Sequence, residues 1–300
     1  GLAVVRLDLS QAMGLEDWRL ITRYILENLE LRRDGTIYRG LPDVVDALSH
    51  AEGTDIKGLE SAKLPHPGFR RAIVAQMRSQ DLGDEAIAQV HRYLSGERVP
   101  AGTLSRLGVS GVKSPLSKRN AEQVLNTAIG SLFLLGVPGT MILFDENEKT
   151  FDTKYPNSRR VQLAANLVRR FIDACFTGTL TGTVAIFAVL PGFLQSCSMV
   201  YPALGQRLQL DGGNGSRPAW RWPVLPVEST GMSSPEDFLE ALIERLTRIV
   251  ELCSGKTTQV VEQMRHEGER ILQENAGGGY RRPLIKALSA VALDHIEVKQ

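Results

Sequence analysis

The sequence predicts an α/β fold built around a parallel sheet. Two short apolar runs, at 140–145 and 183–190, have the length of buried strands, and a third strand pattern opens the chain at 1–9. Long segments with helical spacing of apolar residues lie between them. Strands separated by helices favour parallel pairing. With 300 residues, of which 43% are apolar, the chain is long enough to bury a large core.

The first half of the chain reads as mostly helical. The opening strand has no lead-in before Gly1, a pattern typical of a fragment whose upstream part is missing. The tract 10–135 is far too long for a simple crossover, so it is predicted to be a helical insertion. Apolar residues recur at helical spacing near 16–31, 41–51, 67–80, 84–96 and 119–135. His66, between two prolines, is expected in a loop.

The second half alternates strands and helices and then becomes helical. The predicted elements are a strand at 140–145, a helix at 158–175, strands at 183–190 and 222–227, and helices at 235–254, 257–274 and 283–296. The resulting domain organisation has an α/β core made of 1–9 and 136–228, the insertion 10–135, and a C-terminal helical part at 229–300.

Composition excludes several classes of protein. The 35 basic and 34 acidic side chains nearly cancel, so any nucleic-acid or membrane surface must be a local patch. No apolar run reaches the roughly 18–20 residues that span a bilayer. Three cysteines without a CxxC pair favour a reducing compartment, and we therefore expect a cytoplasmic protein. The five histidines form no pair with metal-ligand spacing.

The most informative segment is the apolar strand that ends in two acids, Met141–Glu146. Carboxylates beside a buried strand are costly unless a cation lies near them. In P-loop nucleotidases that cation is Mg²⁺; the first acid, here Asp145, holds the metal, and the second, here Glu146, orients the attacking water. The alternative is a strand that simply ends in an acidic turn.

A phosphate-binding loop of the GxxxxGK[ST] type is not complete anywhere in the chain. Ser254–Thr258 contains the GK[ST] core, but it follows a helical run instead of a strand, and Val250 replaces the first glycine. Gly108–Ser114 lacks both required glycines and is followed by Pro115. The predicted metal-binding strand therefore lacks its phosphate cradle, which we expect upstream of Gly1; the chain alone should have no appreciable affinity for ATP.

Several stretches along the chain occur in the order and spacing of a known family. They are Val4–Ser10, Tyr93–Glu97 with Leu107–Val109, Asp145–Glu148, Ala165–Asp173, Pro191–Leu194 and Tyr201–Leu208. Together they resemble the ATP-binding P-loop proteins of BREX-type bacterial phage defence, which are AAA+/STAND-like ATPases. The resemblance implies a five-stranded parallel sheet, a C-terminal helical lid at 229–300, and an ATP-driven motor or switch that works with other defence proteins as a homo-oligomer.

The resemblance also implies roles for individual residues. Asp145 would bind Mg²⁺ and Glu146 would orient water, while Glu148 has no assigned task. Arg207 would be an arginine finger that reaches the γ-phosphate in a neighbouring subunit, or alternatively a surface helix arginine. Arg282 would be the lid arginine that senses nucleotide. The cofactors implied are ATP and Mg²⁺, and the reaction is hydrolysis of ATP to ADP and phosphate.

One departure from the family pattern supports a different reading. Strand 183–190 should end in a polar residue near the γ-phosphate, but it ends in Val189 and Leu190. The alternative function is therefore a non-hydrolysing nucleotide-sensing scaffold, or a DNA or protein adaptor. Basic doublets, such as those at 118–119 and 169–170, would contact DNA if they shared one face. Trp220–Trp222 would stack on a base or a partner, or one of its Trp side chains would instead pack at the entry of the strand at 222–227.

Overall fold

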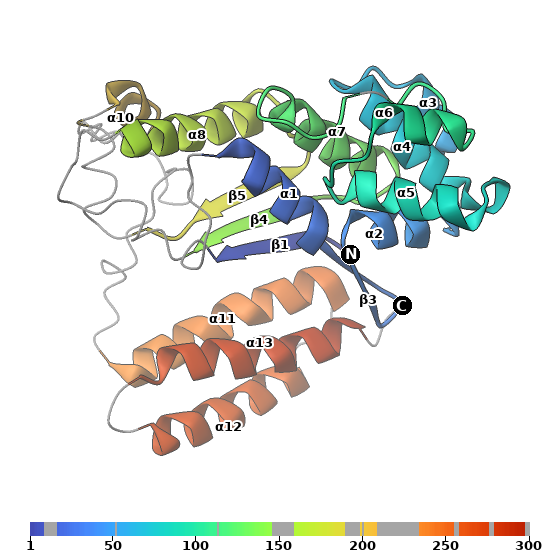
Figure 1. The fold of residues 1–300 in the computed structure, drawn as a ribbon. Coiled ribbons are helices and arrows are strands. Elements are labelled where there is room, and N and C mark those ends of the chain that lie inside the picture. The colour runs from blue at the N-terminus through green and yellow to red at the C-terminus, as the bar shows by residue number, and fades with distance from the viewer. Residues whose placement is uncertain are drawn as a thin grey trace. The chain divides into compact units, whose positions relative to one another are not determined.

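The computed structural model describes residues 1–8, 17–51, 53–112, 114–145, 159–189, 199, 201–208, 234–254, 258–275 and 279–297. The chain divides into two compact units, Gly1–Pro223 and Val224–Gln300. Each unit has its own hydrophobic core and is described by itself. Figure 1 shows the sheet of the first unit and the three helices of the second.

The first unit contains a five-stranded sheet with the strand order β3-β2-β1-β4-β5. Its strands are β1 (Ala3–Asp8), β2 (Glu30–Arg33), β3 (Thr36–Arg39), β4 (Thr140–Asp145) and β5 (Thr183–Phe187). β1, β4 and β5 are parallel, whereas β2 pairs with β1 and β3 in antiparallel fashion. The predicted α/β class is confirmed. The expectation of five parallel strands is wrong, because two of the five form an antiparallel hairpin.

That hairpin interrupts the tract expected to be helical. The helix predicted over 16–31 ends at Asn28, and the chain then forms β2 and β3. Asp34 and Gly35 connect them with φ angles of 51° and 74°. Two consecutive residues with positive φ are typical of a type I′ turn, whose twist matches that of the two strands it joins. Asp-Gly is a preferred sequence for this turn. The local turn signal therefore outweighs the helical spacing of the residues before it.

Helices account for most of the rest of the first unit. They are α1 (Trp18–Asn28), α2 (Leu41–Ser49), α3 (Ile56–Ser61), α4 (Pro67–Met77), α5 (Asp84–Leu94), α6 (Ala101–Arg106), α7 (Ala121–Leu134), α8 (Arg159–Phe176) and α10 (Pro202–Leu208), with a short 3₁₀ turn, η1, at Ser79–Asp81. The predicted helices at 41–51, 67–80, 84–96, 119–135 and 158–175 are confirmed within a few residues at each end. The short helices α3 and α6 were not predicted.

The two faces of the sheet differ in burial. Alternate residues of β1 and β4, including Val5, Leu7, Ile142 and Phe144, are at most 1% exposed. Helices α1, α7 and α8 lie along one side of the sheet (Figure 1). Alternation places every second side chain on the same face, so Arg6, Asp145 and the half-exposed Val184 and Ile186 belong to the opposite face. A strand end on that face is accessible to a ligand.

An aromatic cluster fixes α1 and α8 to the parallel strands. The ring of Phe171 stacks on Trp18 at 4.8 Å between centroids and meets Phe144 edge-on at 5.2 Å. Phe144 stacks in turn on Phe187 of β5 at 4.2 Å. The guanidinium of Arg170 lies over Trp18, 5.5 Å from the ring centroid, and pairs with Glu122. The helix α8, which follows β4 in the chain, is thereby tied to α1, α7, β4 and β5.

His66 has a structural role that its sequence position did not reveal. It is the N-cap of α4, where Nδ1 accepts the N–H of Phe69 at 2.9 Å and the backbone N–H donates to Thr127 Oγ1 at 2.8 Å. Its side chain is buried, and the burial lowers the pKa of His66 below the usual value of 6.5. The prediction of a plain loop residue is therefore replaced by a buried neutral cap.

This cap predicts a pH dependence of stability. Below pH 6.5 the unfolded chain binds a proton at His66, whereas the folded chain binds it only at a lower pH. The stability that is present above pH 6.5 is therefore lost as the pH falls through the pKa of the folded state. His66→Asn keeps a capping oxygen and removes the titration. Between pH 7.5 and 5.5 we expect the wild type to lose up to about 1 kcal/mol more than His66→Asn in urea unfolding. Parallel pH profiles would contradict this role.

The second unit is a three-helix bundle. Its helices are α11 (Pro235–Ser254), α12 (Thr258–Glu274) and α13 (Arg281–Glu297), within two residues of the three predicted helices. Side chains from all three helices form its core, among them Leu239, Ile243, Met264, Leu284 and Leu288. The strand predicted at 222–227 lies outside the described residues. Within the described part of the chain, the structure contains no helix with the length and apolar content needed to cross a bilayer.

Candidate functional site

Asp145 is the last residue of β4, as the sequence predicted, and β4 lies between two parallel neighbours. Because parallel strands end at the same edge of a sheet, the ends of β1 and β4 lie side by side. In the pairing of these strands Asp8 is opposite Asp145. Residues paired in this way are about 4.8 Å apart and point to the same face. Two carboxylates thus share the carboxyl edge of the sheet.

A cation already contacts one of them. Arg6 donates from Nη2 to Asp145 Oδ2 at 2.7 Å. Arg6 belongs to β1, two residues before Asp8, so its side chain extends along the same face toward the strand end. The side chains of Arg6 and Asp145 are 55% and 38% exposed. An ion pair as exposed as this contributes about 0–1 kcal/mol to stability, so a divalent cation can displace it at small cost.

The donor atoms at this edge fit Mg²⁺. Mg²⁺ is usually held through one or two carboxylates, with the remaining ligands supplied by waters and nucleotide phosphates. Asp145 and its neighbour Asp8 offer oxygens of the required kind. The described residues contain no cluster of three or more His, Cys, Asp or Glu side chains that would hold a metal without further ligands. The edge therefore suits a cation that arrives with a phosphate ligand better than a metal in a protein cage.

Comparison with protein families identifies the group to which the chain is related. A family model described as "BREX system ATP-binding protein BrxC/D" matches residues 30–281. The chain belongs to this family. The BREX resemblance found in the sequence is thereby confirmed. The comparison with curated proteins and the comparison with solved structures found no match.

The family match covers the candidate residues of this BREX chain unequally. Asp145 and Arg207 lie inside the matched range, whereas Arg6 and Asp8 precede it and Arg282 lies one residue beyond it. The ion pair between Arg6 and Asp145 therefore joins a matched strand to one outside the match. The family match therefore does not include Arg6, the residue that pairs with Asp145 in the structure.

The other predicted site residues are described only in part. Glu146, Glu148 and Leu190 lie outside the described residues. Arg207 lies on α10, which packs against α8, and its side-chain position is not described. The structure thus brings Asp145 together with Arg6 and Asp8, while the predicted roles of Glu146 and Arg207 stay predictions.

Arg282 belongs to the second unit. It is an exposed side chain in the first turn of α13, and no described residue pairs with it. Its neighbour Arg281 has a structural partner, because its guanidinium lies over the ring of Phe238 at 5.4 Å from the centroid. Of the two arginines, Arg282 is therefore the one without a described partner.

The two incomplete phosphate loops of this BREX chain each follow a helix. Gly108–Ser114 follows helix α6, and Ser254–Thr258 connects α11 to α12. A phosphate loop links a strand to a helix, so neither stretch has the required context. Both predictions from the sequence are consistent with these positions.

Sequence reasoning missed Arg6 and Asp8. The alternation of β1 shows that both lie on the face opposite to Val5 and Leu7. The signal that could have indicated them is the presence of two charged residues in a strand that is otherwise apolar. What the sequence alone lacks is the pairing of β1 with β4, which brings Arg6 to a carboxylate 139 positions away.

Proposed function

We propose that this BREX chain contributes to an ATP site at the carboxyl edge of β4, and that the intact protein hydrolyses Mg²⁺–ATP to ADP and phosphate. It would act as an AAA+-like P-loop motor or switch in phage defence. One observation carries the proposal: in a member of an ATP-binding family, Asp145 ends the middle one of three parallel strands, with a second carboxylate beside it. Ligands of open α/β sheets bind outside the carboxyl ends of the strands.

Each residue has a proposed task. Asp145 holds the metal, and Glu146, which follows it in the sequence, orients the attacking water. Mg²⁺ bound with the nucleotide would neutralise the charge on the phosphate oxygens. Arg6 keeps the carboxylate of Asp145 in place when no metal is bound. Arg207 and Arg282 would stabilise phosphate charge, from a neighbouring subunit in the case of Arg207.

Removing the carboxylate of Asp145 tests the site. In the intact protein, we expect wild-type ATP binding to depend on Mg²⁺, and Asp145→Asn to weaken binding in Mg²⁺ by at least about tenfold because a metal ligand is lost. Calorimetric titration with ATP, in Mg²⁺ and in EDTA, measures both quantities. Asp43→Asn, at an exposed aspartate in the first turn of α2, is the matched control. Wild-type affinity and Mg²⁺ dependence in Asp145→Asn would exclude the proposal.

Removing the competing cation should have the opposite effect. Arg6→Gln removes the ion pair that Arg6 makes with Asp145 at 2.7 Å. Since such a pair is worth about 0–1 kcal/mol, the apparent affinity for Mg²⁺ should rise by up to about fivefold. A Mg²⁺ titration at saturating ATP measures this change. A lower Mg²⁺ affinity in Arg6→Gln would mean that Arg6 supports the metal site instead of competing with it.

The same ion pair favours a second candidate function. A guanidinium that permanently replaces the metal at Asp145 would suit a non-hydrolysing nucleotide sensor or a DNA or protein adaptor. This alternative predicts ATP binding without Mg²⁺ dependence and without turnover in the intact protein. Measuring the molecular size of the protein with and without a non-hydrolysable ATP analogue further distinguishes the two functions. The motor is expected to form a homo-oligomer when it binds nucleotide.

A further inference from the structure

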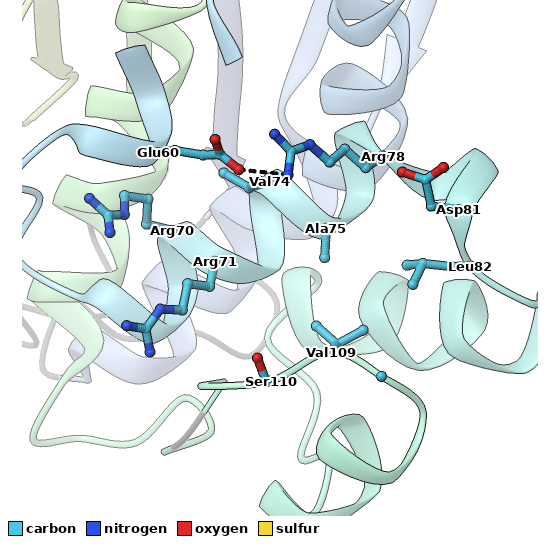
Figure 2. A pocket seen from close by; sticks show the side chains of 11 residues that line it. Glu60, Arg70, Arg71, Val74, Ala75, Arg78, Asp81, Leu82, Val109 and Ser110 are labelled. Atoms are coloured by element: carbon cyan, nitrogen blue, oxygen red, sulfur yellow. Dashed lines mark ion pairs between the residues drawn. The ribbon is translucent and has the colours of Figure 1, made fainter. Parts of the chain in front are cut away.

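A groove on the helical part of the first unit lies apart from the elements that hold Asp145. It is formed by α3, α4 and the turns that follow η1 and α6, and its volume is about 570 Å³. That volume is in the range of small-molecule sites in proteins. Figure 2 shows its lining residues, among them three arginines: Arg70 and Arg71 of α4, and Arg78, the C-cap residue of that helix.

Arg71 lies on α4 and Arg78 caps the end of that helix, so their spacing places both along one line of it. Arg71 and Arg78 are seven residues apart, which is close to two helical turns, so both lie on the same face about 10 Å apart along the axis. Ala75 lies between them, and its small side chain leaves space on the floor of the groove. The groove therefore presents two guanidinium groups across an open floor.

The charges in the groove do not cancel. Arg78 donates from Nη1 to Glu60 at 2.8 Å, and Asp81 is the second acid of the lining. Within the described ranges, Arg70 and Arg71 have no carboxylate partner. Their contacts are to backbone carbonyls: Arg70 donates to the oxygen of Ala62, and Arg71 to that of Gly111 at 3.1 Å. Carbonyl contacts orient a guanidinium without neutralising its charge.

One of these arginines also has a donor without an acceptor. Nε of Arg70 is buried and has no hydrogen-bond partner among the residues that the structure describes. A buried donor left unpaired costs about 1–3 kcal/mol, so such atoms often indicate a missing ligand or water. Each guanidinium carries five N–H donors, and the carbonyl contacts use only one of them on Arg70 and one on Arg71. The remaining Nη donors of the two guanidinium groups have no partner among the described residues, and an oxyanion can accept from them.

The turn after α6 is shaped to receive Arg71. Gly111 has a φ of +74°, and a Cβ at this position would lie 2.2 Å from Arg71 Nη1. The absence of a side chain at Gly111 therefore lets the guanidinium approach the backbone. Ser110, an exposed neighbour in the same turn, adds a hydroxyl to the groove wall (Figure 2).

We propose that this groove binds the phosphate groups of a ligand, through Arg70, Arg71, Arg78 and the hydroxyl of Ser110. The planar fork of arginine matches phosphate oxygens in pairs, and charge-assisted bonds of this kind are the strong ones. Glu60 acts as a competitor that holds Arg78 until a phosphate replaces it. Free phosphate and the backbone of a nucleic acid share this chemistry, and the test below distinguishes them. The proposal does not depend on the ATP site.

The test compares variants of the chain with two probes. The probes are inorganic phosphate, followed by thermal shift and by NMR titration, and a fluorescently labelled DNA duplex of 20 base pairs, followed by anisotropy at several salt concentrations. Arg71→Gln and Arg78→Gln should each weaken phosphate binding by about tenfold, as expected for loss of a charge-assisted bond. Glu60→Gln should strengthen binding severalfold, because it frees Arg78. Arg92→Gln, at an exposed arginine of α5 paired with Glu97, should leave binding unchanged.

The results assign the source of the phosphate. Parallel changes for the duplex and for free phosphate would identify a nucleic-acid backbone, and changes confined to free phosphate would identify a small phosphate ligand. Wild-type binding of both probes by Arg71→Gln, Arg78→Gln and Glu60→Gln would overturn the proposal. If Arg71→Gln does not fold, Arg71→Lys keeps the charge and removes the paired contact, so weaker binding is still expected. Repeating the phosphate titration in Asp145→Asn, where no change is expected, separates this groove from the ATP site.

Discussion

Replacing Phe171 with alanine is expected to lower the free energy of unfolding of the first unit by about 3–5 kcal/mol. The ring is fully buried and contacts Trp18, Phe144 and Phe187, which belong to α1, β4 and β5. Its removal leaves a cavity between the sheet and its covering helices, and it also breaks the stacked and edge-on contacts. Each such aromatic pair adds about 0.5–1.5 kcal/mol beyond the area that it buries.

The same helix provides a matched control. Phe176, the last residue of α8, is 92% exposed, so Phe176→Ala should change stability by no more than about 0.5 kcal/mol. Urea unfolding of both variants, followed by circular dichroism and by tryptophan fluorescence, measures the difference. A loss below about 1 kcal/mol in Phe171→Ala would show that α8 is not held to the sheet by this cluster. The arrangement around the end of β4 would then lack its main support.

The sequence was most informative where a local pattern decides the structure. The helical periods of α2, α4, α5, α7 and α8 were recognised, because each buries one apolar stripe. Asp145 was placed at a strand end because an apolar run stops there. The hairpin was missed although Asp34 and Gly35 carry its turn signal, since the residues before it also fit a helical period.

The parts of the site that were not predicted depend on contacts between distant segments. Arg6 meets Asp145 only because β1 and β4 pair in parallel, and nothing near either residue in the sequence specifies that register. In the same way, the turn at 108–111 carries an incomplete phosphate-loop pattern, which does not indicate the distant residue that it contacts. Its contact with Arg71, forty positions earlier, shows instead that it forms one wall of a basic groove. Both cases need the fold before the chemistry can be recognised.

Replacing Glu146 with glutamine is expected to reduce ATP turnover in the intact protein by at least about 100-fold while leaving ATP affinity within a few-fold of the wild type. Glutamine has nearly the same shape as glutamate but cannot accept a proton from the attacking water. Loss of a general base typically lowers the rate by about 10²–10⁴-fold. Phosphate release at saturating Mg²⁺–ATP and calorimetric titration measure the two quantities. Glu85→Gln, at an exposed glutamate in the first turn of α5, is the control.

Comparison with Asp145→Asn makes this prediction specific. If Asp145 holds the metal and Glu146 orients water, the first variant should lose Mg²⁺-dependent binding, whereas the second should bind and fail to turn over. A residue that only stabilises the end of β4 would affect both properties together, and would also lower the unfolding free energy. Unchanged turnover in Glu146→Gln would remove Glu146 from the mechanism, whereas ATP binding without any turnover in the wild type would favour the non-hydrolysing sensor as the account of the Arg6–Asp145 pair.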